Sequence, residues 1–406
     1  MTQQSSHTFL GSAALIRMAH AEQDLTLLST RLLAEIGDIP SVTHADAMLD
    51  LSTILQIKGE REVALSLQEE SLRLKQLYHL AAPTGIPRIR LLALMAPGDL
   101  MTNTPLDFLL EGSDIALHIL YVAPHLPFPD TLPEHDVMFV GIGESDETQA
   151  LLQLLDVALQ GWPRPIINHA EHITWLSRDR AYTRLSELPG VVMPATARAT
   201  YASLHTMLQE NSPLLHLLAD IAYPLIIRPV GSHAGHGLER IDDAAALQDY
   251  LQRTVSDTYY ISRFIDYRDA DDQYRKYRVV LVEGKPYAAH MGISSHWMIH
   301  YLNAGMSESA EKRTEEERFM TSFDESFAVR HAEALAEIYQ AMQLDYLVLD
   351  CAETKTGELL LFEVDNSAVV HTMDPLTLFP YKQPQMRKVF DAFRTMLVRA
   401  IVSPGD

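Results

Sequence analysis

The chain has 406 residues, 47% of them hydrophobic, and this length and composition are typical of a soluble protein with more than one core. Its formal net charge of -22 at pH 7 repels the phosphate backbone of nucleic acids, so we expect no nucleic-acid partner. Cys351, the single cysteine, excludes an intrachain disulfide, and the sequence has neither a leader pattern nor a long apolar run, so we expect a cytoplasmic protein without a membrane partner.

The first part of the chain, residues 8 to about 80, has helical spacing of its apolar residues. The segment from Ala45 to Leu74, with Gly59 at its turn, looks like one tetratricopeptide-type helical hairpin. About two such units are too few for a self-supporting array, so the region must pack on the rest of the protein or on a second subunit. We predict a helical region over residues 1–83 that docks or forms a homodimer, with a peptide-binding platform as the alternative.

The next part, residues 88–172, predicts a small parallel α/β sheet. Apolar strand-like runs at 89–95, 116–122 and 136–141 alternate with short helical segments. The loop at 141–145 follows a strand, and ligands of open α/β sheets commonly bind at such loops. Its two glycines are not a dinucleotide fingerprint, because the third glycine is missing.

A loop of small residues follows the strand-like run that ends at Arg228. Glycines and Ser232 leave backbone N–H groups free to surround anionic oxygens, and Arg228 places positive charge near them. The segment 223–241 therefore predicts a phosphate-covering loop. The alternative is a turn in which glycine only permits the reversal of a hairpin.

Two apolar runs near the end of the chain, 346–350 and 357–366, predict a hairpin that carries hard oxygen ligands. Residues two apart in a strand share a face, so Glu363 and Asp365 point the same way, and strand pairing brings Asp350 beside them. These carboxylates suit Mg²⁺, with Mn²⁺ as a substitute, bridging to substrate phosphates. An acidic hairpin that faces solvent is the alternative.

Taken in order, these segments resemble the ATP-grasp superfamily, closest to its RimK-like and glutathione-synthetase-like members. The resemblance covers about residues 165 to 400, and the matching segments are an opening helix at 177–185, a turn at 188–194, the loop, an adenine-binding hinge at 259–266, and a strand pair at 275–290. It implies an α+β / α/β multidomain fold with a helical region, a pre-ATP-grasp α/β domain and a core of two α+β subdomains. The predicted boundaries are 1–83, 88–172, 173–260 and 261–402.

The resemblance also implies roles for single residues. Catalytic roles fall to Arg278, Arg228 and Asn303, and metal binding falls to Asp350, Glu363 and Asp365. Nucleotide binding is implied for a larger set, which comprises Arg180, Arg228, Ser232, His233, Gly235, His236, Gly237, Arg263, Phe264, Ile265 and Lys276.

The chain departs from the superfamily pattern at several of these positions. The two lysines that usually hold the ATP phosphates are Arg180 and Arg228, which keep the charge but present a planar fork. Arg263 and Lys276 replace acidic residues, so recognition of the ribose by an acidic group is in doubt. Asp365 stands where asparagine is common, which adds charge for a divalent cation.

Several histidines do not belong to the predicted metal set. His290, His296 and His300 have spacings that fit no zinc site once a strand is included, so structural or substrate-contacting roles are favoured. His371 follows the metal strand and is a candidate proton acceptor for an incoming amine.

The predicted function is an ATP- and Mg²⁺-dependent ligase that activates a carboxylate as an acyl phosphate and passes it to an amine or related nucleophile. The carboxylate substrate is a small molecule, such as an amino acid, or a peptide. One alternative is a phosphotransferase, and a second is a non-catalytic nucleotide- or peptide-binding protein of the same fold.

Overall fold

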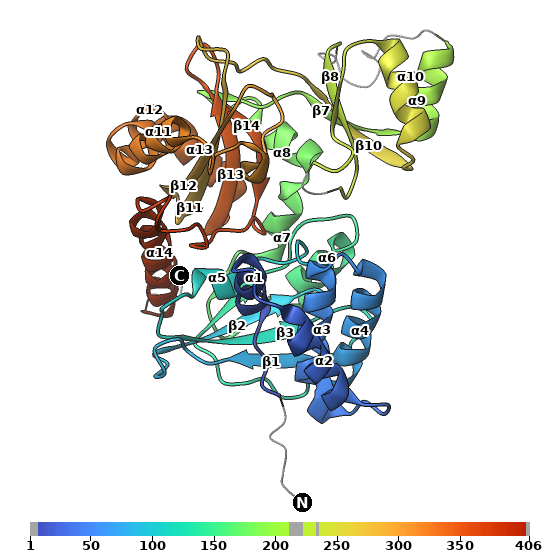
Figure 1. The fold of residues 1–406 in the computed structure, drawn as a ribbon, viewed down its shortest axis with the longest axis vertical. Helices are drawn as coiled ribbons and strands as arrows, with labels where there is room; N and C mark the ends of the chain where they lie inside the picture. Colours follow the sequence, from blue (N-terminus) through green and yellow to red (C-terminus); the bar gives the residue numbers. More distant parts are fainter. Residues whose placement is uncertain (1–6, 211–221, 233–234, 403–406) are drawn as a thin grey trace, which may run out of the picture.

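The structure is a computed structural model that describes residues 7–210, 222–232 and 235–402. Its elements form a helical N-terminal region and three sheets (Figure 1). The predicted mixed α and β, multidomain fold class is confirmed. The domain boundaries given above stay predictions.

The N-terminal region is helical and amphipathic. Gly59, at φ 85°, allows the sharp turn between two of its helices, and Ser71 donates a hydrogen bond to the Ala45 carbonyl at 2.9 Å, which lets these helices approach closely. Apolar residues such as Leu15, Leu32 and Met48 form its core. The elements are α1 (Ser12–His20), α2 (Leu25–Ile36), η1 (Val42–His44), α3 (Ala45–Ile57) and α4 (Arg61–Leu74).

This region is fixed to the rest of the same chain at α1. Asp107 accepts hydrogen bonds from the Ala13 N–H at 2.6 Å and from the Ser12 hydroxyl at 2.9 Å. Because these are the first residues of α1, the carboxylate satisfies a helix N-terminus that has no intrahelical partners. The helical region therefore packs on its own chain, while a homodimer stays a prediction.

The first sheet has the order β1-β3-β2-β4-β5, in which β1 is antiparallel to β3 and the other pairs are parallel. The parallel sheet predicted for this region is thus a mixed one, because a strand from the region predicted as helical joins its edge. That strand is only four residues long, which is too short to show an alternating pattern. The elements are β1 (Leu77–Leu80), β2 (Ile89–Met95), α5 (Leu106–Leu109), β3 (Ile115–Tyr121), β4 (Val137–Val140), α6 (Gln149–Ala158) and β5 (Ile166–Ile167).

The second sheet is antiparallel, has the order β7-β10-β8-β9, and lies with its two helices at the upper right of Figure 1. Leu204, Ile227, Leu247 and Tyr259 belong to a hydrophobic cluster of its own. We call this unit the lid. Its elements are β7 (Thr196–Thr200), α9 (Tyr201–Gln209), β8 (Leu225–Pro229), β9 (Glu239–Ile241), α10 (Ala244–Arg253) and β10 (Thr258–Arg263).

The third sheet has the order β12-β11-β13-β14-β6. Its strands are β6 (Val191–Val192), β11 (Tyr274–Val282), β12 (Lys285–Ser294), β13 (Tyr346–Glu353) and β14 (Leu359–Asp365). The remaining helical segments are α7 (Ala170–Ile173), η2 (Thr174–Leu176), α8 (Arg178–Leu185), η4 (Tyr301–Asn303), α11 (Ala310–Thr321), η5 (Phe323–Glu325), α12 (Phe327–Arg330), α13 (Ala332–Met342) and α14 (Lys382–Val402). None of the helices in the described ranges combines the length and apolar character that a bilayer crossing requires.

The first and third sheets share one hydrophobic core, in contrast to the lid. The ring of Phe139 lies 6.4 Å from that of Tyr346 and 5.7 Å from that of Phe393. Asn168 also binds both backbone groups of Tyr346, donating to its carbonyl at 2.9 Å and accepting from its N–H at 3.0 Å. The start of β13 is therefore held rigidly, which matters because the middle of the strand carries Asp350, a member of the charged row described next.

Candidate functional site

A row of charged side chains crosses three neighbouring strands of the third sheet. Arg278 of β11 lies opposite Asp350 of β13, which in turn lies opposite Glu363 of β14. Residues that are directly opposite on paired strands share a face, as do residues two apart on one strand. Lys276 and Asp365 therefore join the same face, and the predicted grouping of the acidic residues on paired strands is present.

Asp350 is the most strongly paired member of this row. Arg278 binds it with two N–H groups at 2.8 and 3.0 Å, and Lys276 Nζ lies 2.7 Å from its Oδ2. Only 6% of Asp350 is exposed. Burial by itself would raise the pKa of this carboxyl, but the charges of Arg278 and Lys276 overcome burial and hold the pKa well below its usual range.

Glu363 meets arginines from two other elements. Arg178, the first residue of α8, donates to the Phe362 carbonyl at 3.0 Å and to Glu363 Oε1 at 2.5 Å. Burial opposes ionisation of Glu363, yet the charges of Arg178 and of Arg228 lower its pKa. Arg228 belongs to lid strand β8, so the lid and the third sheet contribute charges to one site.

Arg228 holds the backbone of the small-residue loop. Its guanidinium donates to the Ser232 hydroxyl at 3.1 Å and also to the Ser232 carbonyl. Burial, followed by the neighbouring charge of Arg178, lowers the pKa of Arg228 to about 10. Two half-buried guanidinium groups that influence each other's charge in this way favour an anion near them.

Asp365 is the acidic residue whose charge is least compensated. The Ser367 N–H and hydroxyl donate to its Oδ1 at 2.7 and 2.8 Å. Burial and then the charge of Glu363 raise the pKa of Asp365. A pair of half-buried carboxylates, in which the charge of Glu363 raises the pKa of Asp365, suits a hard divalent cation.

The structure does not contain a preformed site of three acidic ligands. In the described part of the chain, no group of three or more His, Cys, Asp or Glu side chains is placed to hold a metal ion. Asp350 is already occupied by Lys276 and Arg278, which leaves Glu363 and Asp365 as the pair whose chemistry fits Mg²⁺. The three-residue ligand set stays a prediction.

The two arginines of the opening helix differ in their contacts. Arg178, which was not assigned a role from the sequence, contacts Glu363, whereas Arg180 donates to the Thr174 carbonyl at 2.9 Å. A role for Arg180 in phosphate binding stays a prediction. The sequence alone does not tell which of the two arginines faces the site, because both lie in the first turn of one helix.

The small-residue loop is described only in part, and His233 lies outside the described residues. Gly235 and Gly237 have φ of 72° and 66°, so both need the freedom of glycine. The Gly237 carbonyl accepts a hydrogen bond from Tyr250 at 2.7 Å, which ties the loop to α10. Ser232 contacts Arg228 as described above, and His236 is exposed.

The predicted hinge segment follows lid strand β10. The N–H groups of Arg263 and Phe264 donate to the carbonyls of Ala195 and Pro224 at 3.0 and 3.2 Å. Adenine recognition through the backbone of residues 263–265 stays a prediction, but these two N–H groups already have partners. The backbone groups that stay as candidates for binding adenine are therefore the carbonyls of residues 263–265 and the N–H of Ile265.

Two further candidates have contacts that limit their roles. Asn303 Oδ1 accepts the N–H of His300 at 3.0 Å and so caps a short helical turn, and its catalytic role stays a prediction. Burial lowers the pKa of His371 to about 4, and its Nδ1 accepts the N–H of Met373 at 3.1 Å. A neutral ring in that arrangement carries its proton on Nε2, so His371 is suited to donate a hydrogen bond and not to accept a proton.

A second charged cluster links the lid to the first sheet. Arg198 of β7 binds Asp146 at 2.7 Å, Asp179 at 3.3 Å and the Tyr260 hydroxyl at 2.6 Å. Glu144 lies among these groups in the predicted ligand-binding loop 141–145. Burial raises the pKa of Glu144 to about 7 against the opposing charge of Arg198.

The same loop contacts the end of β14. Asn366 donates to the Ile142 carbonyl at 2.9 Å, and its own carbonyl accepts from Thr104 at 2.8 Å. A Cβ built on Gly143 would lie 2.9 Å from the Thr102 carbonyl oxygen and 3.0 Å from Ser367 Oγ, so glycine allows this close approach. The first sheet therefore fixes the position of the strand end that carries Glu363 and Asp365.

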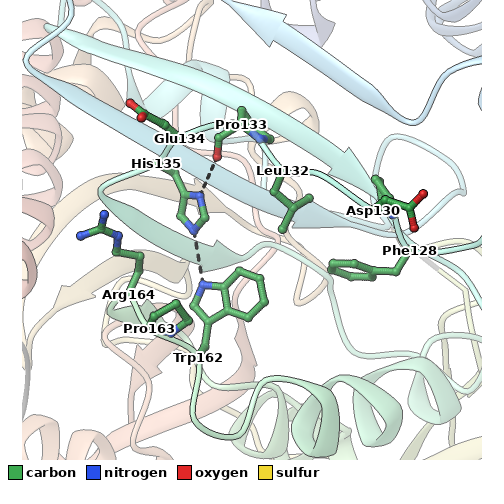
Figure 2. A pocket seen from close by; sticks show the side chains of 10 residues that line it. Phe128, Asp130, Leu132, Pro133, Glu134, His135, Trp162, Pro163 and Arg164 are labelled. Atoms are coloured by element: carbon green, nitrogen blue, oxygen red, sulfur yellow. Dashed lines mark hydrogen bonds between the residues drawn. The ribbon is translucent and has the colours of Figure 1, made fainter.

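A cavity of about 430 Å³ at the edge of the first sheet is separate from this site (Figure 2). Its wall includes His135, which donates from Nδ1 to the Pro133 carbonyl at 2.9 Å and accepts from Trp162 at 3.3 Å. Both ring nitrogens are therefore satisfied within the protein. The cavity contains none of the residues of the charged row.

The comparisons with known proteins give distant likenesses. No protein-family model matches the chain, and no curated protein matches it. Among solved structures, D-alanine–D-alanine ligase from Bacillus anthracis complexed with ATP is 12% identical with a TM-score of 0.47, over 78% of this chain and 100% of that one. A RimK domain ATP-grasp protein from Sphaerobacter thermophilus is 17% identical with a TM-score of 0.40, over 76% and 99% of the two chains. D-alanine–D-alanine ligase from Coxiella burnetii is 10% identical with a TM-score of 0.47, over 77% and 95%.

One of these structures carries the superfamily name that the sequence motifs predict. At these values the likeness is too distant to support an activity. The charges and contacts of the site itself are what bear on function.

The raised pKa of Glu144 predicts a pH dependence of stability. A carboxyl whose pKa rises from 4.5 to about 7 on folding stabilises the fold below about pH 4.5, and this contribution is lost as the pH rises through 7. We expect the free energy of unfolding of Glu144→Gln to equal that of the wild type near pH 4.5. At pH 8 we expect it to be about 1–3 kcal/mol higher than that of the wild type.

Urea denaturation of both proteins at the two pH values measures this difference. Glu147→Gln, at an exposed neighbour in the same segment, is the matched control. If the free energies of unfolding of the wild type and Glu144→Gln differ by the same amount at both pH values, the raised pKa of Glu144 is wrong.

Proposed function

We propose that the protein is an ATP- and divalent-metal-dependent ligase that joins a carboxylate to an amine. The observation that carries this proposal is the convergence of Arg228 from the lid and Arg178 from α8 on Glu363, beside Asp365, Arg278 and Lys276. Cations that face a pair of acidic residues across a lid and a sheet fit a metal-bound triphosphate.

The nucleophile that this site favours is already an anion. Lys276 and Arg278 share a strand face and form a paired cation that already holds the Asp350 carboxylate and presents positive charge to a substrate carboxylate beside it. A carboxylate needs no proton removed before it attacks phosphorus, whereas a hydroxyl needs a base. The two cations on this face therefore support activation of an acid over phosphorylation of an alcohol.

In the proposed reaction, a carboxylate oxygen bonds to the terminal phosphorus while the bond to the ADP oxygen breaks, which gives an acyl phosphate. The amine nitrogen then bonds to the acyl carbon, phosphate leaves, and the amine loses a proton. Arg228 and Arg178 offset the negative charge that develops on the transferred group. A metal held by Glu363 and Asp365 would neutralise charge on the phosphates.

The lid has a second role in this scheme, which is to exclude water. An acyl phosphate hydrolyses if water reaches it before the amine does. The loop that Arg228 holds through Ser232 lies at the edge of the lid. A screen of acids and amines would identify the substrate, which is a small molecule or the end of a peptide.

Replacement of Glu363 tests the proposal directly. We expect the wild type to bind ATP in calorimetry only with Mg²⁺ or Mn²⁺, and to release ADP and phosphate with at least one acid in a panel of amino acids and short peptides. Glu363→Gln removes a charge from the metal site and should abolish ADP release.

Glu358→Gln, in the exposed turn before β14, is the control and should match the wild type. Unchanged turnover in Glu363→Gln would reject the metal site. A stable phosphorylated product without an amide would favour the phosphotransferase, and no nucleotide binding by the wild type would reject both enzymatic functions.

The two arginines of α8 give a second test. Arg178 contacts Glu363 and Arg180 does not, so Arg178→Ala should raise the Kd for Mg²⁺-ATP about 10-fold or more, the cost of a charged hydrogen bond. Arg178→Lys keeps the charge and should lose less. A larger effect for Arg180→Ala in the same calorimetric titration would show that the sequence-based assignment, and not the observed contact, identifies the phosphate ligand.

A further inference from the structure

His300 lies where the third-sheet part of the molecule meets the lid loop. It precedes η4, where its N–H donates to Asn303 Oδ1 at 3.0 Å and its side chain accepts in return from the Asn303 backbone. This reciprocal cap holds the ring in one orientation. The ring nitrogen in the cap is Nδ1, because Nε2 has no partner among the described residues.

The Nε2 atom of His300 is buried and is aimed at Gly235 of the small-residue loop. A Cβ built on Gly235 would come within 2.2 Å of it, so the ring is in close contact with the loop backbone. With Nδ1 accepting, a neutral ring carries its proton on Nε2. The result is a buried N–H donor without an acceptor, which is unfavourable unless a ligand supplies one.

The surroundings of His300 indicate what the acceptor is. Burial, followed by the charge of Lys276, lowers the pKa of His300; the charge of Asp350 opposes this shift, and Arg228 and Arg278 add to it. The ring is therefore a neutral donor near three cationic side chains, of which Lys276 and Arg278 already pair with Asp350. An anionic oxygen is the acceptor that suits both this donor and the positive charge of Arg228.

We propose that His300 is a further catalytic residue, whose Nε2–H donates to an oxygen of the terminal phosphate of the bound nucleotide. The inference rests on the proposed function, since it assigns a contact within that site. His300 makes no covalent bond and transfers no proton in this role. It orients the terminal phosphate between the lid and the sheet.

Nucleotide affinities of His300 variants test this contact. In calorimetry with Mg²⁺, we expect His300→Leu to weaken ATP binding about 10-fold or more while ADP binding changes less than about 3-fold, because only ATP has the contacted group. His300→Gln places an amide N–H near the position of Nε2 and should restore most of the ATP affinity. His296→Leu, at an exposed histidine four residues earlier, should behave as the wild type for both nucleotides.

The outcomes separate the contact from the proposed function. If wild type binds both nucleotides and His300→Leu weakens them equally, or weakens neither, the contact with the terminal phosphate is wrong while the site stands. If His300→Gln fails to recover ATP affinity, although its thermal unfolding matches the wild type, the hydrogen bond is likewise wrong. If the wild type binds neither nucleotide, the proposed function fails and the inference fails with it.

Discussion

The pairing of Asp350 with Arg278 and Lys276 is the interaction on which the arrangement of the site depends. A buried carboxylate needs compensation, and its two cationic partners lie on one face of the adjacent strand β11. This arrangement fixes the cations beside Glu363 and Asp365 without neutralising those two residues. The sheet thus presents fixed positive and negative groups side by side, as a metal-bound triphosphate requires.

The lid has a hydrophobic core that is separate from the core of the other two sheets. The first and third sheets share a core, and Phe139 and Asn168 hold the start of β13, the strand that carries Asp350. The lid packs around its own residues. A unit with its own core can move relative to a rigid base at little cost in buried apolar area. Polar contacts such as that of Arg198 with Asp146 join the lid to the first sheet.

The sequence predicts the acidic row because strands repeat every two residues, so Glu363 and Asp365 must share a face once the strand is recognised. It also identifies Arg228 as the cation before the small-residue loop. It cannot choose between Arg178 and Arg180, because the rotation of a helix start depends on tertiary packing. The sequence also does not reveal short strands such as β1 and β6, because they are fixed by pairing with residues far along the chain. Nor does it reveal which nitrogen of His371 carries the proton, because that depends on the hydrogen bond from Met373.

Anomalous diffraction from crystals grown with Mn²⁺ and a non-hydrolysable ATP analogue is the most direct measurement of the central claim. We expect a manganese peak within coordination distance of Glu363 and Asp365 oxygens, next to phosphates that contact Arg178 and Arg228. A nucleotide bound elsewhere, or a manganese peak that avoids both carboxylates, would contradict the account.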